Sequence, residues 1–235
     1  KESIKEADST DDTNYTEDDK KAEEVKKVYL TFDDGPSKNT EKILDTLDEY
    51  HIKATFFVTG RDDEESLERY RQIAERGHTI GMHSYSHVYE DIYESAEKFE
   101  LDLDRIQKTI ENATGIKCML YRFPGGSSNQ VSSVEMSEFI RILNKREITY
   151  FDWNAECGDA SNVTYTAKEM VANVMKDVVK YHTSVVLMHD AENKQETLKA
   201  LPMIIKKLQK MDAQLLPIDE DTTVVQHISA DRVND

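Results

Sequence analysis

Two adjacent carboxylates and a spaced pair of histidines are the side chains of this sequence best suited to chemistry. Asp33 and Asp34 follow a short β-rich run, and His83 and His87 stand four positions apart farther along. Neighbouring carboxylates raise each other's pKa unless a positive group holds them, and two imidazoles with a carboxylate make a three-ligand site for a catalytic divalent metal. Asp-Gly-Pro alone is also turn chemistry, and HxxxH alone is a weak signal. Together the two motifs predict a metal site.

Two further motifs carry groups that can complete a reaction centre. Arg122 precedes a Pro-Gly-Gly sequence, whose glycines let the backbone approach a ligand closely. His189 and Asp190 end another apolar run, and a histidine amid carboxylates is a candidate acid or base. Taken alone, each motif is equally compatible with a structural arginine or a structural histidine.

The segments between these motifs alternate between strand and helix patterns, which predicts a parallel sheet. The strands are continuous apolar runs, as expected when both faces of a sheet are covered. We expect strands at 28–32, 54–58, 79–82, 119–123, 148–153, 184–188 and 214–218, and helices at 39–50, 64–76, 96–113, 132–146, 167–181 and 197–211. A compact β/α barrel is favoured over an open doubly wound sheet. In both folds the carboxyl ends of the strands converge, so the four motifs are expected to meet there.

The composition argues against several classes of function. The formal net charge is -17, from 47 acidic and 30 basic residues. Such a surface does not favour phosphate contacts with nucleic acid or a basic face on anionic lipid, and no apolar run is long enough to span a membrane. We expect no nucleic-acid partner and a monomeric protein. Cys118 and Cys157 are expected at opposite ends of the sheet, out of reach of a disulfide, and so should be two free thiols.

The chain is expected to have three parts. Residues 1–26 are predicted to be an acidic, flexible linker, because so few apolar side chains cannot offset the entropy of ordering. Residues 27–220 should form the folded domain, and 221–235 a C-terminal tail. With no initiator methionine or signal peptide, the chain resembles a form trimmed at its N-terminus, as for a secreted or surface-tethered enzyme, with a frayed cytosolic terminus as the alternative.

Five segments, taken in order, resemble the motifs of the NodB-homology polysaccharide deacetylases, also called carbohydrate esterase family 4. They are Thr31-Phe32-Asp33-Asp34-Gly35-Pro36, His83-Ser84-Tyr85-Ser86-His87, Arg122-Phe123-Pro124, Trp153 to Asp159 and Leu187-Met188-His189-Asp190. The resemblance runs from about Val28 to about Ile218. It implies an α/β fold, a distorted (β/α)7-type barrel of parallel strands with outer helices, and metal-dependent hydrolysis of N-acetyl or O-acetyl groups on sugar polymers.

The resemblance also implies a role for each matching residue. One divalent metal ion, zinc in the first place with cobalt, nickel or manganese as alternatives, would be bound by Asp34, His83 and His87. Asp33 would be the general base, oriented by Arg122, and His189 would be the general acid. The substrate site would be lined by Pro124, Gly125, Trp153 and Leu187, with Leu187 against the acetyl methyl group.

The chain departs from the family pattern at two places. Gly125 stands where the family usually has a tyrosine, so its backbone N–H can still serve the oxyanion while the side-chain wall is lost. The fourth motif usually reads Asp-x-x-Asp-Trp, and the aligned stretch here is Glu156-Cys157-Gly158-Asp159-Ala160. Glu156 would then support the acid histidine. The tyrosine-rich stretch of Tyr85, Tyr89 and Tyr93 either offers a stacking surface to sugar rings or packs in the core.

The function expected from the resemblance is deacetylation of N-acetylglucosamine in peptidoglycan, with an acetylated glycan polymer as the substrate. The expected location is extracellular or on the cell surface, in a bacterial envelope. An acetyl xylan esterase and a chitin-oligosaccharide deacetylase are alternatives with the same metal site. A barrel that binds carbohydrate without turnover is the alternative from a different class.

Overall fold

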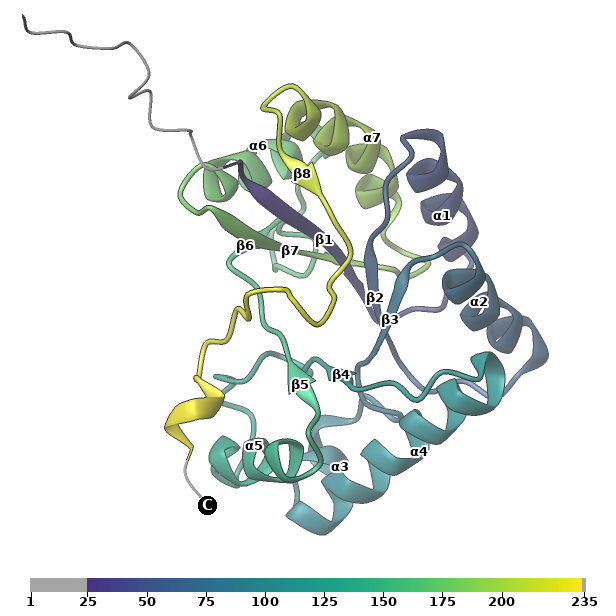
Figure 1. The fold of residues 1–235 in the computed structure, drawn as a ribbon, viewed down its shortest axis with the longest axis vertical. Coiled ribbons are helices and arrows are strands. Elements are labelled where there is room, and N and C mark those ends of the chain that lie inside the picture. The colour runs from purple at the N-terminus through teal and green to yellow at the C-terminus, as the bar shows by residue number, and fades with distance from the viewer. Residues whose placement is uncertain (1–24, 234–235) are drawn as a thin grey trace, which may run out of the picture.

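Within residues 25–233, which the computed structural model describes, eight strands form one sheet and all pairings are parallel. The strand order is β5-β4-β3-β2-β1-β7-β6, with β8 beside the start of β1 (Figure 1). The strands are β1 (Lys27–Asp33), β2 (Thr55–Val58), β3 (Thr79–Met82), β4 (Leu120–Tyr121), β5 (Thr149–Tyr150), β6 (Ala155–Glu156), β7 (Thr183–His189) and β8 (Gln214–Leu215). This arrangement confirms the predicted distorted (β/α)7-type barrel of parallel strands with outer helices.

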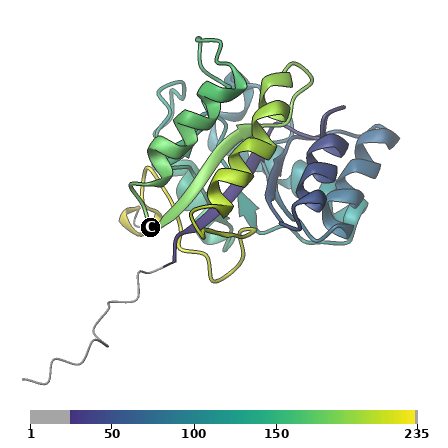
Figure 2. The same ribbon diagram turned by 90° about the horizontal axis from the view of Figure 1, so that it is seen from above.

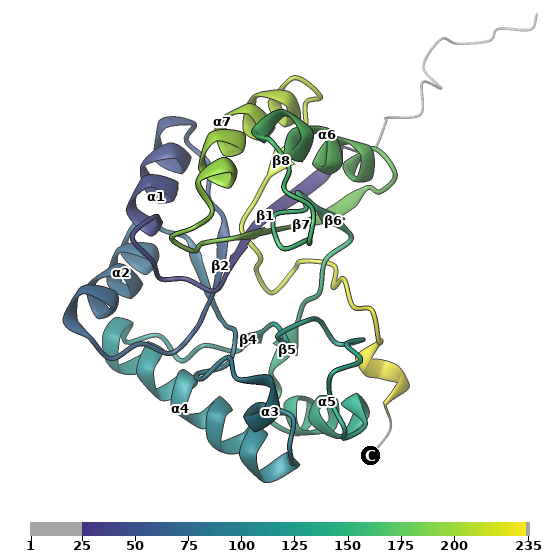
Figure 3. The ribbon, with the colours of Figure 1, turned by 180° about the vertical axis from the view of Figure 1, so that it is seen from behind.

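The helices lie around the outside of the strands, as Figures 1 and 3 show from opposite sides. Figure 2 shows α6 and α7 lying along β7 and β1. The helices are α1 (Thr40–Glu49), α2 (Glu64–Glu75), α3 (Tyr89–Ile92), α4 (Ala96–Thr114), α5 (Met136–Lys145), α6 (Ala167–Val178) and α7 (Gln195–Gln209), followed by a 3₁₀ turn, η1 (Ala230–Arg232). Local capping sets several of their ends. The Ser95 side chain accepts from the Lys98 N–H at the start of α4, and Gly115 ends that helix with a φ of 75°.

Alternation along the strands sorts their side chains into two layers. On β1, Val28, Leu30 and Phe32 belong to the main core under the helices. Tyr29 belongs instead to a smaller core inside the barrel, together with Phe57, Phe151, Val185 and Ile218. Because successive side chains of a strand point to opposite faces, Asp33 at the end of β1 continues the inner row.

The barrel is open on one side, because β5 and β6 end the strand order at its two edges and do not pair in the described part of the chain. Residues near the C-terminus lie against this seam. The Asp152 N–H donates to the Val225 carbonyl (2.7 Å), and the Gln226 amide donates to the Tyr150 carbonyl (3.0 Å). The short elements β6 and α3 were not predicted, and β4 and β5 are only two residues long where longer strands were expected.

Other expectations from the sequence have mixed outcomes. Cys118 and Cys157 are both free and buried, as predicted. None of the helices between residues 25 and 233 is long and apolar enough to cross a membrane. The predicted linker at 1–26 lies outside the described residues apart from Val25 and Lys26, and the domain boundaries at 27, 220 and 221 stay predictions.

Candidate active site and metal centre

The predicted site residues meet at the carboxyl ends of four strands. In the ladder between β1 and β7, Asp33 pairs directly with His189. Met82 pairs with Tyr121 between β3 and β4, so His83 and Arg122 each follow the last paired residue of their strand. The convergence predicted from the parallel pattern is therefore present.

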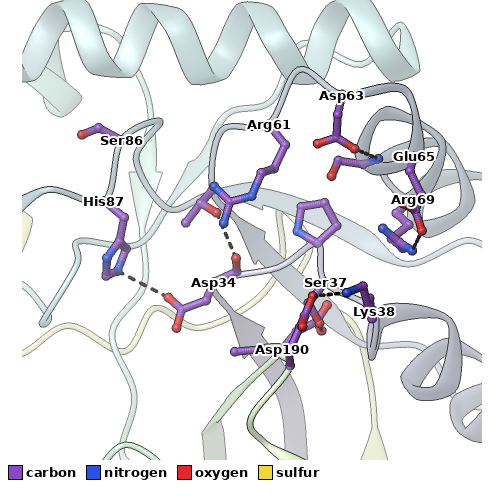
Figure 4. Close-up of a pocket in the computed structure, with 15 residues that line it drawn as sticks. Asp34, Ser37, Lys38, Arg61, Asp63, Glu65, Arg69, Ser86, His87 and Asp190 are labelled. Atoms are coloured by element: carbon purple, nitrogen blue, oxygen red, sulfur yellow. Dashed lines mark hydrogen bonds and ion pairs between the residues drawn. The ribbon is translucent and has the colours of Figure 1, made fainter.

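Three of these side chains form a group with the chemistry of a metal site. The ligand atoms of Asp34, His83 and His87 all lie within 4.8 Å of one another. Asp34 Oδ1 is 3.7 Å from His83 Nε2 and 3.4 Å from His87 Nε2 (Figure 4 shows the Asp34–His87 pair). Atoms that bind one ion tetrahedrally at ~2.1 Å lie about 3.4 Å apart, so the donor set and its spacing fit a first-row divalent cation.

Backbone conformation orients Asp34 and His87, and a hydrogen bond orients His83. Asp34 and His87 have φ values of 75° and 54°, in the left-handed region that non-glycine residues seldom adopt. His83 Nδ1 lies 2.9 Å from the Arg122 carbonyl. A carbonyl can only accept, so Nδ1 carries the proton and the Nε2 lone pair faces Asp34. Burial lowers the pKa of His83, which favours this neutral form.

Asp33 is held by a fully buried arginine. Arg122 Nη1 donates to Asp33 Oδ1 (2.8 Å) and to Thr31 Oγ1 (2.7 Å). Its other nitrogens donate to the backbone carbonyls of Phe151 (2.9 Å) and Asp152 (3.0 Å). The second carboxylate oxygen of Asp33 is left facing the ligand group, 3.8 Å from His83 Nε2. Arg122 thus lies where an orienting residue for Asp33 was expected.

The contact expected of Glu156 is made by Asp159. His189 Nδ1 lies 2.7 Å from Asp159 Oδ1, and the His189 N–H donates to Oδ2 of the same carboxylate (2.9 Å). Glu156 is an exposed residue of β6 on the rim of the cavity. Gly158, with a φ of 87°, turns the following residue toward His189. The signal was present in the sequence, since Asp159 is the other carboxylate of the same five-residue stretch.

The His189–Asp159 pair is partly buried, and each partner favours the charged form of the other. Burial opposes the charged form of His189, but the hydrogen bond and charge of Asp159, with smaller effects of Asp33 and Asp34, leave the His189 pKa raised. Burial likewise opposes the Asp159 carboxylate, yet contacts with His189 and with the Thr197 hydroxyl (2.8 Å) leave its pKa lowered. Both shifts favour the charged form of each partner, a protonated His189 and an ionised Asp159.

The remaining site residues surround one cavity of about 560 Å³. It is lined by most of the predicted residues, namely Asp33, Asp34, His83, His87, Gly125, Trp153, Glu156, Leu187 and His189. Tyr89, one of the three tyrosines for which sugar stacking or core packing was expected, also lines it, as does Asp159, to which no role was given. Leu187 precedes His189 by two residues, on the same inner face of β7. Arg122 and Pro124 are buried behind the wall, where the Pro124 carbonyl accepts from Tyr93 (2.8 Å).

A second cavity of about 500 Å³ adjoins the first and shares Asp34 and His87 with it (Figure 4). Charged side chains surround it: Lys38, Arg61, Asp63, Glu65, Arg69 and Glu192. The ligand group therefore lies where the two cavities adjoin.

Asp190 is structural, although it neighbours His189. Its carboxylate accepts from the hydroxyls of Ser37 (2.6 Å) and Thr40 (2.5 Å), which ties the loop after β1 to the end of β7. A Cβ at Gly35 would lie 2.5 Å from Asp190 Oδ2, so this turn requires glycine. The His-Asp motif thus contributes one residue to the cavity and one to its scaffold.

Comparisons with known proteins agree with this geometry. A family model described as polysaccharide deacetylase matches residues 20–148. The chain is 31% identical to a peptidoglycan-N-acetylglucosamine deacetylase of Bacillus cereus, over 80% of this chain and 67% of that protein. The catalytic domain of a peptidoglycan N-acetylglucosamine deacetylase from Eubacterium rectale has a TM-score of 0.82 and 38% identity, covering 90% of this chain and 94% of that domain. A CE4 esterase of Streptococcus mutans has a TM-score of 0.72 and 32% identity, covering 83% and 86%.

Proposed function

Because this chain belongs to the polysaccharide deacetylase family, we propose that it is a metal-dependent hydrolase that removes N-acetyl groups from the N-acetylglucosamine of peptidoglycan. One observation carries the proposal. The Asp34, His83 and His87 group lies beside two hydrogen-bonded pairs of opposite charge type, Asp33 with Arg122 and His189 with Asp159. An ionised carboxylate and a protonated histidine are the base and the acid that amide hydrolysis needs.

Asp34, His83 and His87 would hold the metal ion, which when bound polarises a carbonyl and lowers the pKa of water. Their two-nitrogen, one-oxygen set suits zinc, cobalt, nickel or manganese better than magnesium or calcium, which prefer oxygen ligands. The hydrogen bond from His83 Nδ1 to the Arg122 backbone carbonyl leaves the lone pair of Nε2 free to bind the metal ion.

The other residues would carry the proton transfers. Asp33 accepts a proton from the attacking water through the oxygen that Arg122 leaves free. A bond forms between that water oxygen and the acetyl carbon, and the carbon–nitrogen bond breaks. His189 Nε2 donates the proton that the departing amine needs, while Nδ1 stays bonded to Asp159. The products are acetate and a free amino sugar.

The cavity walls would hold the acetyl group during this reaction. The Gly125 N–H would donate to the carbonyl oxygen as negative charge develops there, a contribution commonly worth about 3 kcal/mol. Leu187 would contact the acetyl methyl group, and Trp153 would form a side of the sugar site. With peptidoglycan as its substrate, the protein would act in a bacterial cell envelope.

Acetate release tests the proposal directly. The protein is incubated with N-acetylglucosamine oligomers, peptidoglycan and acetylated xylan, with and without a chelator. We expect acetate from the first two substrates and its loss with chelator. Release from xylan alone would favour an esterase, and release that survives complete metal removal would exclude the proposed chemistry.

Metal analysis of variants provides a matched control. We expect about one equivalent of metal in the wild type and a large loss in His87→Ala. His182→Ala removes an exposed histidine that directly precedes β7, at the end of that strand away from the site, and should retain the metal. Bound metal without acetate release from any acetylated glycan would favour the carbohydrate-binding barrel.

A further inference from the structure

The cavity of about 560 Å³ that holds the predicted site residues, called the main cavity below, has no side chain on its wall at Gly125. This residue has a φ of 78°, a conformation that side chains rarely adopt, and it offers only backbone to the cavity. The space beside it is filled from another part of the chain. A Cβ built at Gly125 would lie 3.2 Å from both Cε1 and Oη of Tyr89, the first residue of α3.

Neighbouring rings fix the position of Tyr89. Its ring meets the His87 ring edge to face, with centroids 5.6 Å apart and planes at 88°. It also contacts the Tyr93 ring, with centroids 5.9 Å apart and planes at 65°. Tyr93 is itself buried and anchored by its hydroxyl to the Pro124 carbonyl (2.8 Å). Tyr89 therefore has a defined place between a candidate metal ligand and the Gly125 loop.

The hydroxyl of Tyr89 is the feature that packing does not explain. Tyr93 and Tyr150 both donate their hydroxyls to backbone carbonyls. Among residues 25–233, Tyr89 has no such partner, although it is half-buried and lines the cavity with Gly125, Leu187 and His189. A phenol ring whose hydroxyl has no partner among these residues can offer an apolar face and a hydrogen-bond donor to the same ligand.

We propose that Tyr89 is a substrate-binding residue, which forms the wall that Gly125 leaves bare and donates its hydroxyl to an oxygen of the acetylated sugar. The ring packs on the apolar face of the sugar, and the hydrogen bond from the hydroxyl fixes the orientation of the sugar in the cavity. This assignment rests on the proposed function, since it places the acetylated sugar between Tyr89 and the inner face of β7. Tyr89 then acts in substrate recognition and leaves proton transfer to Asp33 and His189.

The test uses two substitutions and a matched control. Tyr89→Phe keeps the ring against His87 and removes only the hydroxyl, whereas Tyr89→Ala removes the wall as well. Tyr85→Phe removes a hydroxyl from the same loop, where the Tyr85 ring lies under Arg105 and outside this cavity. Metal content and melting temperature are measured for each variant, so that loss of the fold or of the metal is seen separately.

Two readouts report on the sugar. Trp153 is the single tryptophan of the chain and lines the cavity, so its fluorescence reports binding of an N-acetylglucosamine oligomer to metal-free protein. Acetate release by the metal-loaded protein gives KM and kcat. We expect Tyr89→Phe to weaken binding and raise KM about fivefold with a smaller change in kcat, and Tyr89→Ala to weaken binding about 30-fold. Tyr85→Phe should match the wild type.

The outcomes separate the two proposals. A wild type that binds the oligomer and releases acetate, with Tyr89→Phe equal to it in both assays, would overturn the role of Tyr89 and leave the deacetylase proposal standing. A wild type that binds without releasing acetate, with binding weakened in Tyr89→Phe, would support Tyr89 and overturn the catalytic proposal. A wild type that neither binds nor releases acetate would overturn both.

Discussion

His189 and Asp159 are joined by two hydrogen bonds, one from the ring and one from the backbone N–H, to the two oxygens of a single carboxylate (2.7 and 2.9 Å). The backbone bond fixes where the carboxylate lies, and the ring bond fixes which imidazole nitrogen faces the cavity. Since Nδ1 is engaged with Asp159, Nε2 is the atom that can transfer a proton to substrate.

The first prediction concerns Asp159→Asn. Asp159 raises the His189 pKa against the opposing effect of burial, so its neutralisation should lower that pKa. A lower pKa means that His189 loses its proton at lower pH, so the high-pH limb of the activity profile should move down in pH. The rate of acetate release at neutral pH should fall roughly 10²-fold, and a pH series of kcat measures both effects.

Glu156→Gln is the control for this prediction. Glu156 is exposed on the cavity rim, and its neutralisation should leave the high-pH limb in place. A shift of that limb in Glu156→Gln, with none in Asp159→Asn, would restore the assignment expected from the sequence.

The second prediction concerns Asp33→Asn. The amide oxygen of asparagine can still accept from Arg122, so the fold and the metal site should persist, while the ability to take a proton is lost. We expect kcat to fall by roughly 10²- to 10⁴-fold with metal content unchanged. Acetate assays paired with metal analysis check this, and near-full activity with metal bound would show that Asp33 is not the base.

The third prediction concerns acid stability at the opposite end of the sheet. His78, at the start of β3, is 5% exposed and accepts the Ala54 N–H on Nδ1 (3.1 Å). Burial, with smaller effects of Lys53 and Arg76, lowers its pKa to about 4. Below pH 6.5 His78 is protonated in the unfolded chain but stays neutral in the folded chain. The free energy of unfolding therefore falls as the pH drops toward 4.

His78→Asn should remove this contribution, because the asparagine oxygen still accepts from Ala54 and does not titrate. Between pH 7 and pH 4.5 the free energy of unfolding of the wild type should fall by about 2 kcal/mol more than that of the variant. Urea unfolding at the two pH values measures the difference. If the wild type and His78→Asn lose the same amount of unfolding free energy, a group other than His78 causes the loss of stability in acid.

The fourth prediction tests the boundary at residue 220. The buried Asp152 carboxylate accepts from the Ser127 N–H (2.8 Å) and from the His227 N–H (2.7 Å). A chain ending at residue 220 would lose the second bond and the cover over the seam between β5 and β6. We expect a loss of roughly 2 kcal/mol or more, seen as a melting temperature lower by about 5 °C.

Activity should fall in the shortened chain as well, because the Asp152 carbonyl holds Arg122. A shortened chain that melts and reacts like the full one would support the prediction that residues 221–235 are a C-terminal tail outside the folded domain.

The sequence by itself determined the architecture and the composition of the site. Repeated strand and helix patterns require a parallel sheet, and in such a sheet the strand ends meet, so Asp33, His83, Arg122 and His189 had to converge. These features depend on short-range patterns, which can be read without knowledge of the loops.

Only the tertiary structure decided which side chains in the loops reach the site. Asp159 rather than Glu156 meets His189 because the backbone turns at Gly158, and Asp190 is drawn away by Ser37 and Thr40. Tyr89 lies beside Gly125 because rings from α3 pack against that loop. A loop's path is set by contacts between segments far apart in the chain, so spacing could name the candidates but could not choose among them.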